Sequence, residues 1–212
     1  MVDHDKFSPR LIEGAEQLGV QLTDAQASQL LSYLTLLNKW NKAYNLTAVR
    51  HPEEMLYRHL LDSLSVVTWV KGKRIIDVGT GPGLPGIPLA ILFPETHFTL
   101  LDSNGKKTRF LTQCKLEMGL DNITVVHGRV EEFKPDTPFE QVISRAFSAI
   151  ENMVNWCGHL VDDKGRFLAM KGLFPEGELT SLPEGYKVEE SHSLDVPGCE
   201  GERHLIIIRK DR

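Results

Sequence analysis

Apolar residues recur every three or four positions in three stretches of the first third of the chain, at residues 11–18, 30–40 and 56–67. Ser8 followed by Pro9 predicts the start of a first helix, and Gly19 predicts its end. Thr23 with Gln26 predicts a capping box that opens a second helix. Residues 53–68 predict a third. We therefore expect residues 1–70 to form an N-terminal helical cap.

From residue 74 short apolar runs alternate with helical stretches, a pattern typical of a parallel sheet covered by helices on both faces. The predicted strands are Arg74–Val78, His97–Asp102, Ile123–His127, Gln141–Ser144 and Arg166–Met170. The predicted helices are Ile87–Phe93, Lys106–Met118 and one opened by a capping box from Ser148 to Glu151.

The end of the chain differs, because Tyr186–Val196 and Arg203–Arg209 are strand-like and are joined by a turn containing Pro-Gly. This pattern predicts an antiparallel hairpin at the sheet edge. We predict an α/β, Rossmann-like fold over residues 71–212, with a mainly parallel sheet of seven strands, packed with the cap as one compact unit.

Composition and charge limit the binding partners and the cellular location that we expect. A net charge of −5 gives no general attraction to a polyanion, so any RNA contact needs a local basic surface. No apolar run approaches the roughly 18 residues of a membrane span, so we expect a cytoplasmic protein. We also expect the protein to be a monomer. Cys114, Cys157 and Cys199 lie far apart, which predicts reduced thiols and no metal site.

A glycine loop follows the first predicted strand and precedes a helix, where open parallel sheets bind ligands. It reads Asp77-Val78-Gly79-Thr80-Gly81-Pro82-Gly83. The dinucleotide fingerprint needs Gly or Ala where Leu84 stands, so a pyrophosphate-binding loop is disfavoured. Asp-x-Gly-x-Gly-x-Gly resembles instead the first motif of Rossmann-like methyltransferases. With Asp102 as the acid for ribose hydroxyls, Asp77, Gly79, Gly81 and Gly83 predict an S-adenosylmethionine site.

Further candidates lie at other strand ends and on helix faces. Arg129 and Arg145 follow the third and fourth strands, and surface ion pairs are the alternative for them. Lys171 follows the fifth strand, where it could meet a phosphate or base oxygen; the alternative is a lysine that points to water. Phe147 is either a stacking partner for a base or a core residue. Candidate RNA contacts are Arg58, His59, Lys106, Arg109 and Arg129.

The sequence lacks the motifs of two other kinds of methyl transfer, and this limits the acceptor atoms that we expect. None of the cysteines follows a strand near the glycine loop, so a covalent mechanism on pyrimidine carbon is disfavoured. The Asn/Asp-Pro-Pro-aromatic motif of amino-group methylation is absent, since that position reads Ser144-Arg145-Ala146-Phe147. Guanine N7 needs no general base, because it presents a free lone pair. For this acceptor the enzyme would only have to position the base against the methyl group.

Several motifs together resemble the ribosomal RNA small subunit methyltransferase G family, also called glucose-inhibited division protein B, over residues 25–210. They are Asn45–Ala48, Arg58–Ser63, Asp77–Pro88, Leu101–Ser103, Arg129–Glu132 and Ser144–Ala146. The resemblance implies methylation of guanine N7 in 16S ribosomal RNA of the small subunit. It also implies cofactor contacts at Gly79, Leu84, Val130, Glu131 and Arg145. Arg145, Lys171 and His59 are our catalytic candidates, with a role in positioning rather than in removing a proton.

Two alternatives stay open on the sequence. One is a methyltransferase of the same fold that acts on a small molecule or a protein. The other is a regulatory module that binds S-adenosylmethionine without turnover, because fold does not fix function.

Overall fold

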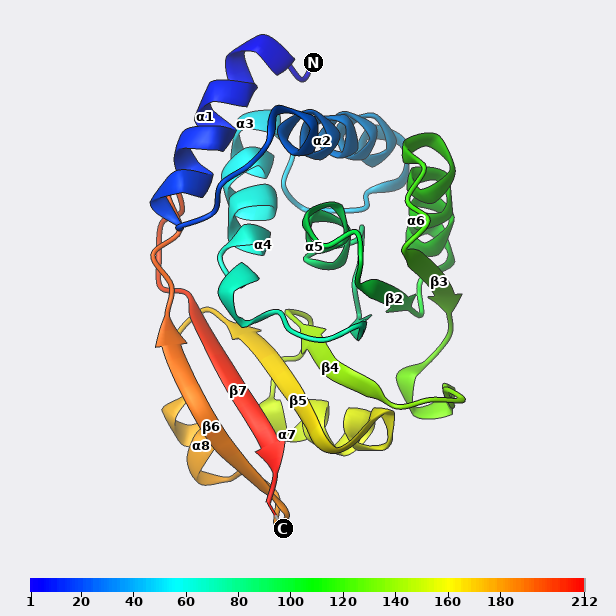
Figure 1. The fold of residues 1–212 in the computed structure, drawn as a ribbon, viewed down its shortest axis with the longest axis vertical. Coiled ribbons are helices and arrows are strands. Elements are labelled where there is room, and N and C mark those ends of the chain that lie inside the picture. The colour runs from blue at the N-terminus through cyan, green and yellow to red at the C-terminus, as the bar shows by residue number, and fades with distance from the viewer. Residues whose placement is uncertain (212) are drawn as a thin grey trace.

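The computed structural model describes residues 1–211, which form a seven-stranded sheet with helices on both faces (Figure 1). The strands are β1 (Arg74–Val78), β2 (His97–Asp102), β3 (Ile123–His127), β4 (Phe139–Ser144), β5 (Val161–Lys171), β6 (Tyr186–Ser193) and β7 (His204–Lys210). Their order is β3-β2-β1-β4-β5-β7-β6, with β7 antiparallel to β5 and to β6. The predicted fold class is confirmed.

Successive residues of each strand enter two separate cores, as the two-residue period of a strand requires. In β1, Ile75 belongs to one core and Ile76 to the other. The first core is covered by α1 (His4–Gln17), α2 (Asp24–Tyr44), α5 (Gly86–Leu92) and α6 (Gly105–Met118), and the second by α7 (Ile150–Cys157) and α8 (Glu176–Thr180) (Figure 1).

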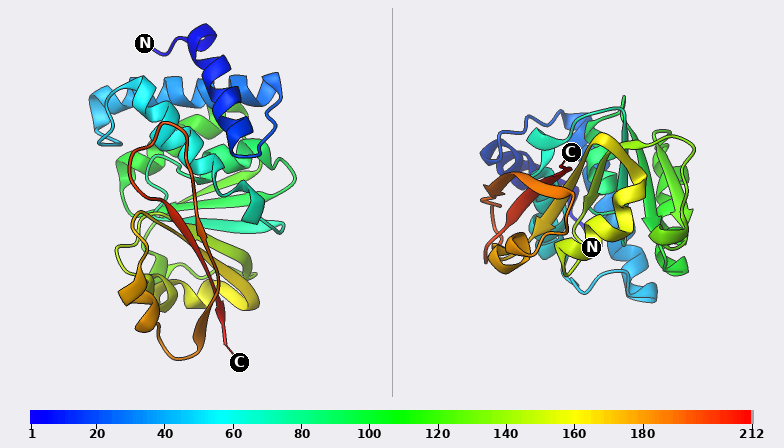
Figure 2. Two further views of the ribbon diagram at one scale, coloured as in Figure 1. Left: turned by 90° about the vertical axis from the view of Figure 1, so that its left-hand side faces the viewer. Right: turned by 90° about the horizontal axis from the view of Figure 1, so that it is seen from below.

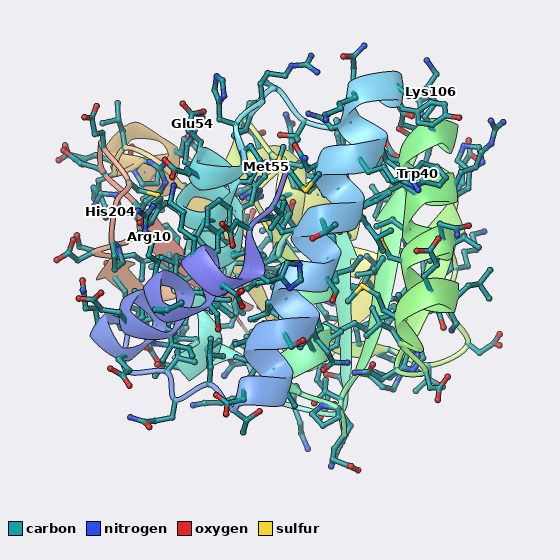
Figure 3. All side chains as sticks on the ribbon, turned by 90° about the horizontal axis from the view of Figure 1, so that it is seen from above. Arg10, Trp40, Glu54, Met55, Lys106 and His204 are labelled. Carbon is teal, nitrogen blue, oxygen red and sulfur yellow. The ribbon has the colours of Figure 1, made fainter. Side chains whose placement is uncertain are left out.

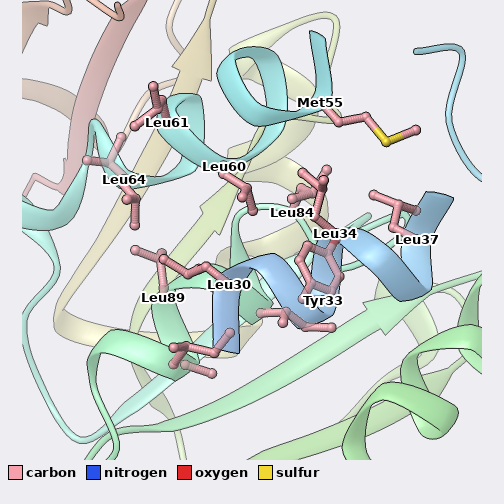
Figure 4. Packing of buried hydrophobic residues seen from close by; sticks show 14 of the residues in the cluster. Leu30, Tyr33, Leu34, Leu37, Met55, Leu60, Leu61, Leu64, Leu84 and Leu89 are labelled. Carbon is pink, nitrogen blue, oxygen red and sulfur yellow. The ribbon is translucent and has the colours of Figure 1, made fainter. Parts of the chain in front are cut away.

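The N-terminal helices share the first core with the sheet. Leu30 and Leu34 of α2 pack with Leu60 and with Leu84 and Leu89, which follow β1 (Figure 4). The loop between β6 and β7 also reaches these helices (Figure 2), and its Val196 is buried in the same core. Residues 1–70 are therefore continuous in packing with the rest of the chain. No helix within residues 1–211 is long and apolar enough to span a bilayer.

The predicted start of the first helix at Ser8-Pro9 is wrong. The helix begins at His4, and Asp3 caps it by accepting a hydrogen bond from the backbone N–H of Lys6 at 3.1 Å. Phe7 is buried, so the additional turn also contributes apolar packing. Pro9 consequently lies inside the helix.

The third predicted helix is real but irregular. It consists of α3 (Pro52–Met55), the π-helix η1 (Leu56–Leu61) and α4 (Asp62–Leu64), followed by the 3₁₀ turn η2 (Val67–Trp69). Ser63 donates its hydroxyl to the carbonyl of His59 at 2.6 Å, a side-chain bond that competes with the regular backbone ladder. Helical periodicity alone does not reveal such a distortion.

The predicted capping box at Ser148 is also wrong. Helix α7 begins at Ile150, and Glu178 of α8 accepts its backbone N–H at 2.8 Å. The cap therefore comes from a tertiary contact, and α8 was not predicted. Two 3₁₀ turns, η3 (Val130–Glu132) and η4 (Gly158–Leu160), complete the chain.

Candidate active site

The glycine loop is held from below by the carboxyl group of Asp77, at the end of β1. Its Oδ2 accepts the hydroxyl of Thr80 at 2.6 Å and the backbone N–H of Gly86 at 2.8 Å. The two bonds join the strand, the loop and the first turn of α5. The loop shape is therefore fixed before any ligand binds.

Burial raises the pKa of Asp77 to about 7, against the opposing effect of the two hydrogen bonds. Its second oxygen, Oδ1, is buried and has no hydrogen-bond partner within residues 1–211. An unpartnered buried acceptor beside a loop of this kind is unusual, because such groups are nearly always satisfied.

Three glycines of the loop have positive φ, namely Gly79 (+66°), Gly81 (+61°) and Gly83 (+102°). A Cβ on Gly79 would lie 2.7 Å from Cβ of Ala146, after β4, whereas one on Gly81 would meet nothing within 4 Å. Glycine at position 79 thus permits both the backbone turn and the close approach of the segment after β4.

Two further groups tie the loop to its surroundings. Asp102, at the end of β2, accepts the backbone N–H of Gly81 through Oδ2 and that of Asn104 through Oδ1, both at 2.8 Å. Tyr33 of α2 is fully buried and donates its hydroxyl to the carbonyl of Pro82 at 2.8 Å. The N-terminal helices therefore help to shape the loop.

A cavity of about 300 Å³ opens beside this loop, and we call it the glycine-loop pocket. Its lining comes from the ends of β1, β2, β3 and β4 and from α7; it includes Gly79, Asp102, Arg129, Val130, Glu131, Ala146, Phe147 and Trp156. Among the predicted cofactor contacts, Gly79, Asp102, Val130 and Glu131 line it. Phe147 packs edge-on against Trp156, with ring centroids 5.8 Å apart.

The other predicted cofactor residues occupy different places. Asp77 lies beneath the loop, Gly81 and Gly83 shape its backbone, and Leu84 is buried in the first core (Figure 4). The side chain of Arg145 points into a second cavity. The sequence placed Arg145 at the correct edge of the sheet, but it did not show which cavity the guanidinium enters.

The lining of the glycine-loop pocket fits S-adenosylmethionine. Asp102 presents a carboxylate that can accept ribose hydroxyls, and Phe147 and Trp156 offer aromatic faces for adenine. At Gly81 a Cβ would meet nothing within 4 Å, so there is room for a ligand to approach the backbone of the loop.

The second cavity, of about 240 Å³, lies on the other side of the segment that follows β4, and we call it the arginine pocket. Its lining comes from η1, α4, the ends of β4, β5 and β6, and the start of β7; it consists of Arg58, His59, Asp62, Arg145, Met170, Lys171, Gly172, Leu194, Arg203 and His204. The three predicted catalytic residues, Arg145, Lys171 and His59, all line this cavity.

A hydrogen-bonded chain runs through the arginine pocket. Thr47 Oγ1 lies 2.8 Å from His59 Nε2, and His59 Nδ1 lies 3.3 Å from Arg145 Nη2. Arg145 Nη1 donates to Asp62 Oδ2 at 3.0 Å, and Arg203 Nε donates to Asp62 Oδ1 at 3.3 Å. The Asn45–Ala48 motif thus acts on the pocket through His59.

The protonation state of His59 follows from this chain. An arginine N–H can only donate, so Nδ1 of His59 accepts and the ring proton sits on Nε2. Burial and the neighbouring Arg145 lower the pKa of His59 to about 3. The ring is therefore neutral near pH 7, and it orients Arg145 without removing a proton.

Lys171, at the end of β5, braces the segment between the pockets. Its Nζ donates to the carbonyls of Phe147 and Ser148, at 3.3 and 2.8 Å, and pairs with Glu178 at 3.1 Å. Its side chain is largely buried. These contacts give Lys171 a positioning role for the segment.

The predicted RNA contacts are spread over the surface. Arg58 lines the arginine pocket and is exposed, whereas His59 lines it as a buried residue. Arg129 is exposed beside the glycine-loop pocket. Lys106 and Arg109 are exposed on α6, and Figure 3 shows Lys106 on the opposite side of the molecule from His204. The structure therefore brings only part of this set together.

Some pocket residues were missed by the sequence reasoning. Arg203 and His204 reach the arginine pocket from the hairpin, and Trp156 reaches the glycine-loop pocket from α7. Arg203 and His204 stand at the start of the apolar strand, and polar residues at a strand end were the available signal for them. For Trp156 the signal is its exposure, which only the structure shows.

Comparison with known proteins decides the family. The model of the family described as rRNA small subunit methyltransferase G matches residues 26–206. The chain belongs to this family. It is 57% identical to the ribosomal RNA small subunit methyltransferase G of Marinobacter nauticus, covering 99% of this chain and 98% of that one. It is 60% identical to that of Pseudomonas aeruginosa strain LESB58, covering 94% of both.

Solved structures confirm the fold. The glycopeptide N-methyltransferase MtfA, complexed with S-adenosylmethionine, superposes with a TM-score of 0.62 at 12% identity, over 73% of this chain and 88% of that one. A Geobacter sulfurreducens S-adenosylmethionine-dependent methyltransferase, in complex with S-adenosylhomocysteine, gives 0.56 at 13% identity, over 84% of this chain and 98% of that one. The family and the fold identify an S-adenosylmethionine-dependent methyltransferase.

Proposed function

We propose that this protein methylates N7 of a guanine in 16S ribosomal RNA, with S-adenosylmethionine in the glycine-loop pocket and the guanine in the arginine pocket. The observation that carries the proposal is the shared wall: Arg145 lines one pocket, and Ala146, Phe147 and Ser148 line the other. The relatives named as small-subunit ribosomal RNA methyltransferases support the choice of RNA.

The residues suit a transfer that needs positioning only. S-adenosylmethionine would supply a methyl group bonded to a positively charged sulfur, and the sulfur would keep the electron pair of the broken bond. Guanine N7 attacks with its free lone pair and loses no proton. Neutral His59 and the hydrogen-bonded Arg145 match this requirement, because neither is arranged as a general base.

The charge that develops on the base also has a partner. Methylation at N7 leaves a positive charge on guanine, and Asp62 presents a carboxylate in the same pocket. A carboxylate in contact with the base partly offsets the unfavourable effect that the surrounding arginines have on this positive charge. Arg58, half exposed at the pocket, is available for a phosphate of the same RNA.

The setting follows from the proposed acceptor. We propose that the enzyme works in the cytoplasm, where small-subunit ribosomal RNA would be its acceptor, and that it does so as a monomer.

Labelled methyl transfer tests this function. Purified protein and labelled S-adenosylmethionine are incubated with small ribosomal subunits lacking the modification, and the labelled nucleotide is mapped by strand cleavage specific for N7-methylguanine. One labelled guanine in 16S RNA is the expected result. Cofactor binding without transfer to RNA would favour the regulatory module, and label on a protein or small molecule would favour the other rival.

A further inference from the structure

Asp62 is the one carboxylate that lines the arginine pocket, among the residues that the structure describes. It is only 6% exposed, and each of its oxygens accepts one guanidinium N–H, from Arg145 and from Arg203. The two arginines therefore fix the orientation of the carboxylate, and their charges offset the free-energy cost of removing it from water. The other ionisable side chains of the lining are arginines, a lysine and histidines.

The carboxylate retains capacity for a ligand. An ionised carboxyl group has about four acceptor sites, and each oxygen of Asp62 uses one for an arginine. A carboxylate with one free site on each oxygen matches two parallel N–H donors, as in its pairing with arginine. The ligand it selects should therefore present such a pair.

Guanine is the nucleic-acid base that presents this pair, through N1–H and the N2 amino group of its Watson–Crick edge. Adenine has an acceptor at N1, cytosine has one at N3, and uracil offers a single N–H there. Bases bound outside a helix are commonly read on this edge. The edge lies opposite N7, so reading it leaves N7 free to react.

We propose that Asp62 selects the acceptor guanine by accepting hydrogen bonds from N1–H and the N2 amino group, with Arg145 and Arg203 holding the carboxylate in place. This inference rests on the proposed function and adds the specificity-determining residue. Thr47 and His59 support it from behind, because they fix the guanidinium that orients Asp62. Lys171 takes no part in base recognition, since backbone carbonyls and Glu178 occupy its ammonium group.

The test pairs a base analogue with a conservative variant. Small subunits are reconstituted with guanosine or with inosine at the acceptor position; inosine lacks the N2 amino group and keeps N1–H and N7. We expect wild-type kcat/KM to fall roughly ten-fold or more with inosine, since a hydrogen bond to a charged acceptor is lost. In Asp62→Asn, kcat/KM with guanosine should fall roughly a hundred-fold, and the guanosine-to-inosine ratio should approach one.

The ratio separates recognition from folding, because a partly unfolded preparation lowers both rates equally. Glu53→Gln is the matched control: Glu53 precedes Asp62 on the same helical segment, pairs with Lys6 and Arg10 away from the pocket, and should leave the ratio unchanged. Equal wild-type rates on guanosine and inosine, or a wild-type ratio in Asp62→Asn, would show that Asp62 is only part of an ion-paired scaffold. A wild-type enzyme that methylates no RNA at all would instead overturn the proposed function.

Discussion

The buried carboxyl group of Asp77 should make the stability of the protein depend on pH in a direction opposite to that of most native carboxylates. Its pKa in the folded protein is about 7, raised by burial, compared with an ordinary value of 3.8. Between those values the folded chain binds a proton that the unfolded chain has lost. The free energy of unfolding therefore falls as the pH rises through this window.

The magnitude follows from the pKa. Each pKa unit corresponds to about 1.36 kcal/mol, so raising the pH from about 5 through the folded pKa should remove roughly 3 kcal/mol of stability through Asp77 alone. The change Asp77→Asn replaces the group with a neutral amide of the same shape, which still accepts from Thr80 and Gly86. The asparagine resembles the protonated acid at every pH, so the variant should lack the pH-dependent part of the stability that comes from Asp77.

Urea denaturation at about pH 5 and about pH 8.5 measures the effect. Wild type should lose roughly 3 kcal/mol more than Asp77→Asn between the two conditions. Asp121→Asn is the control, because Asp121 is exposed and the same chemical change there should leave the wild-type dependence intact. Identical pH dependence in wild type and Asp77→Asn would refute the reasoning, because the native carboxyl would then be ionised throughout.

Two further predictions concern the glycine loop. Tyr33→Phe leaves the buried carbonyl of Pro82 unpaired, so urea denaturation should show a loss of about 1–2 kcal/mol, and a loss below about 0.3 kcal/mol would contradict the bond. Gly79→Ala and Gly119→Ala share nearly the same positive φ, so both should cost about 1 kcal/mol in backbone strain, but only the first meets Ala146. Calorimetric titration should show weaker S-adenosylmethionine binding for Gly79→Ala alone; equal affinities would remove the close approach from the explanation.

Much of the fold could be predicted because local patterns and tertiary structure agree. In the run Arg74–Val78 the neighbours Ile75 and Ile76 point to opposite faces and both are buried, as in a strand that lies between two helical layers. The glycine loop could be predicted because positive φ and a following helix leave a signature in residue type. The C-terminal hairpin was visible because its strands are separated by turn residues.

The fine structure of the site could not be predicted, because it depends on contacts between distant segments. Arg145 follows β4 as expected, yet its direction is set by Asp62 and His59, more than eighty positions away in the chain. Arg203 reaches the same carboxylate from the hairpin. The sequence specifies where strands end, whereas the ion pairs decide which cavity each side chain enters.

The hydrogen bond from Tyr33 to Pro82 has a consequence for protein engineering. Because a residue of the helical cap fixes a residue of the cofactor loop, neither part is an interchangeable module. A chimera that joins this sheet to the cap of another methyltransferase would inherit every loop residue and still lack the contact that shapes the loop. Recombination within this fold should therefore succeed only when the second helix and the glycine loop are taken from the same parent.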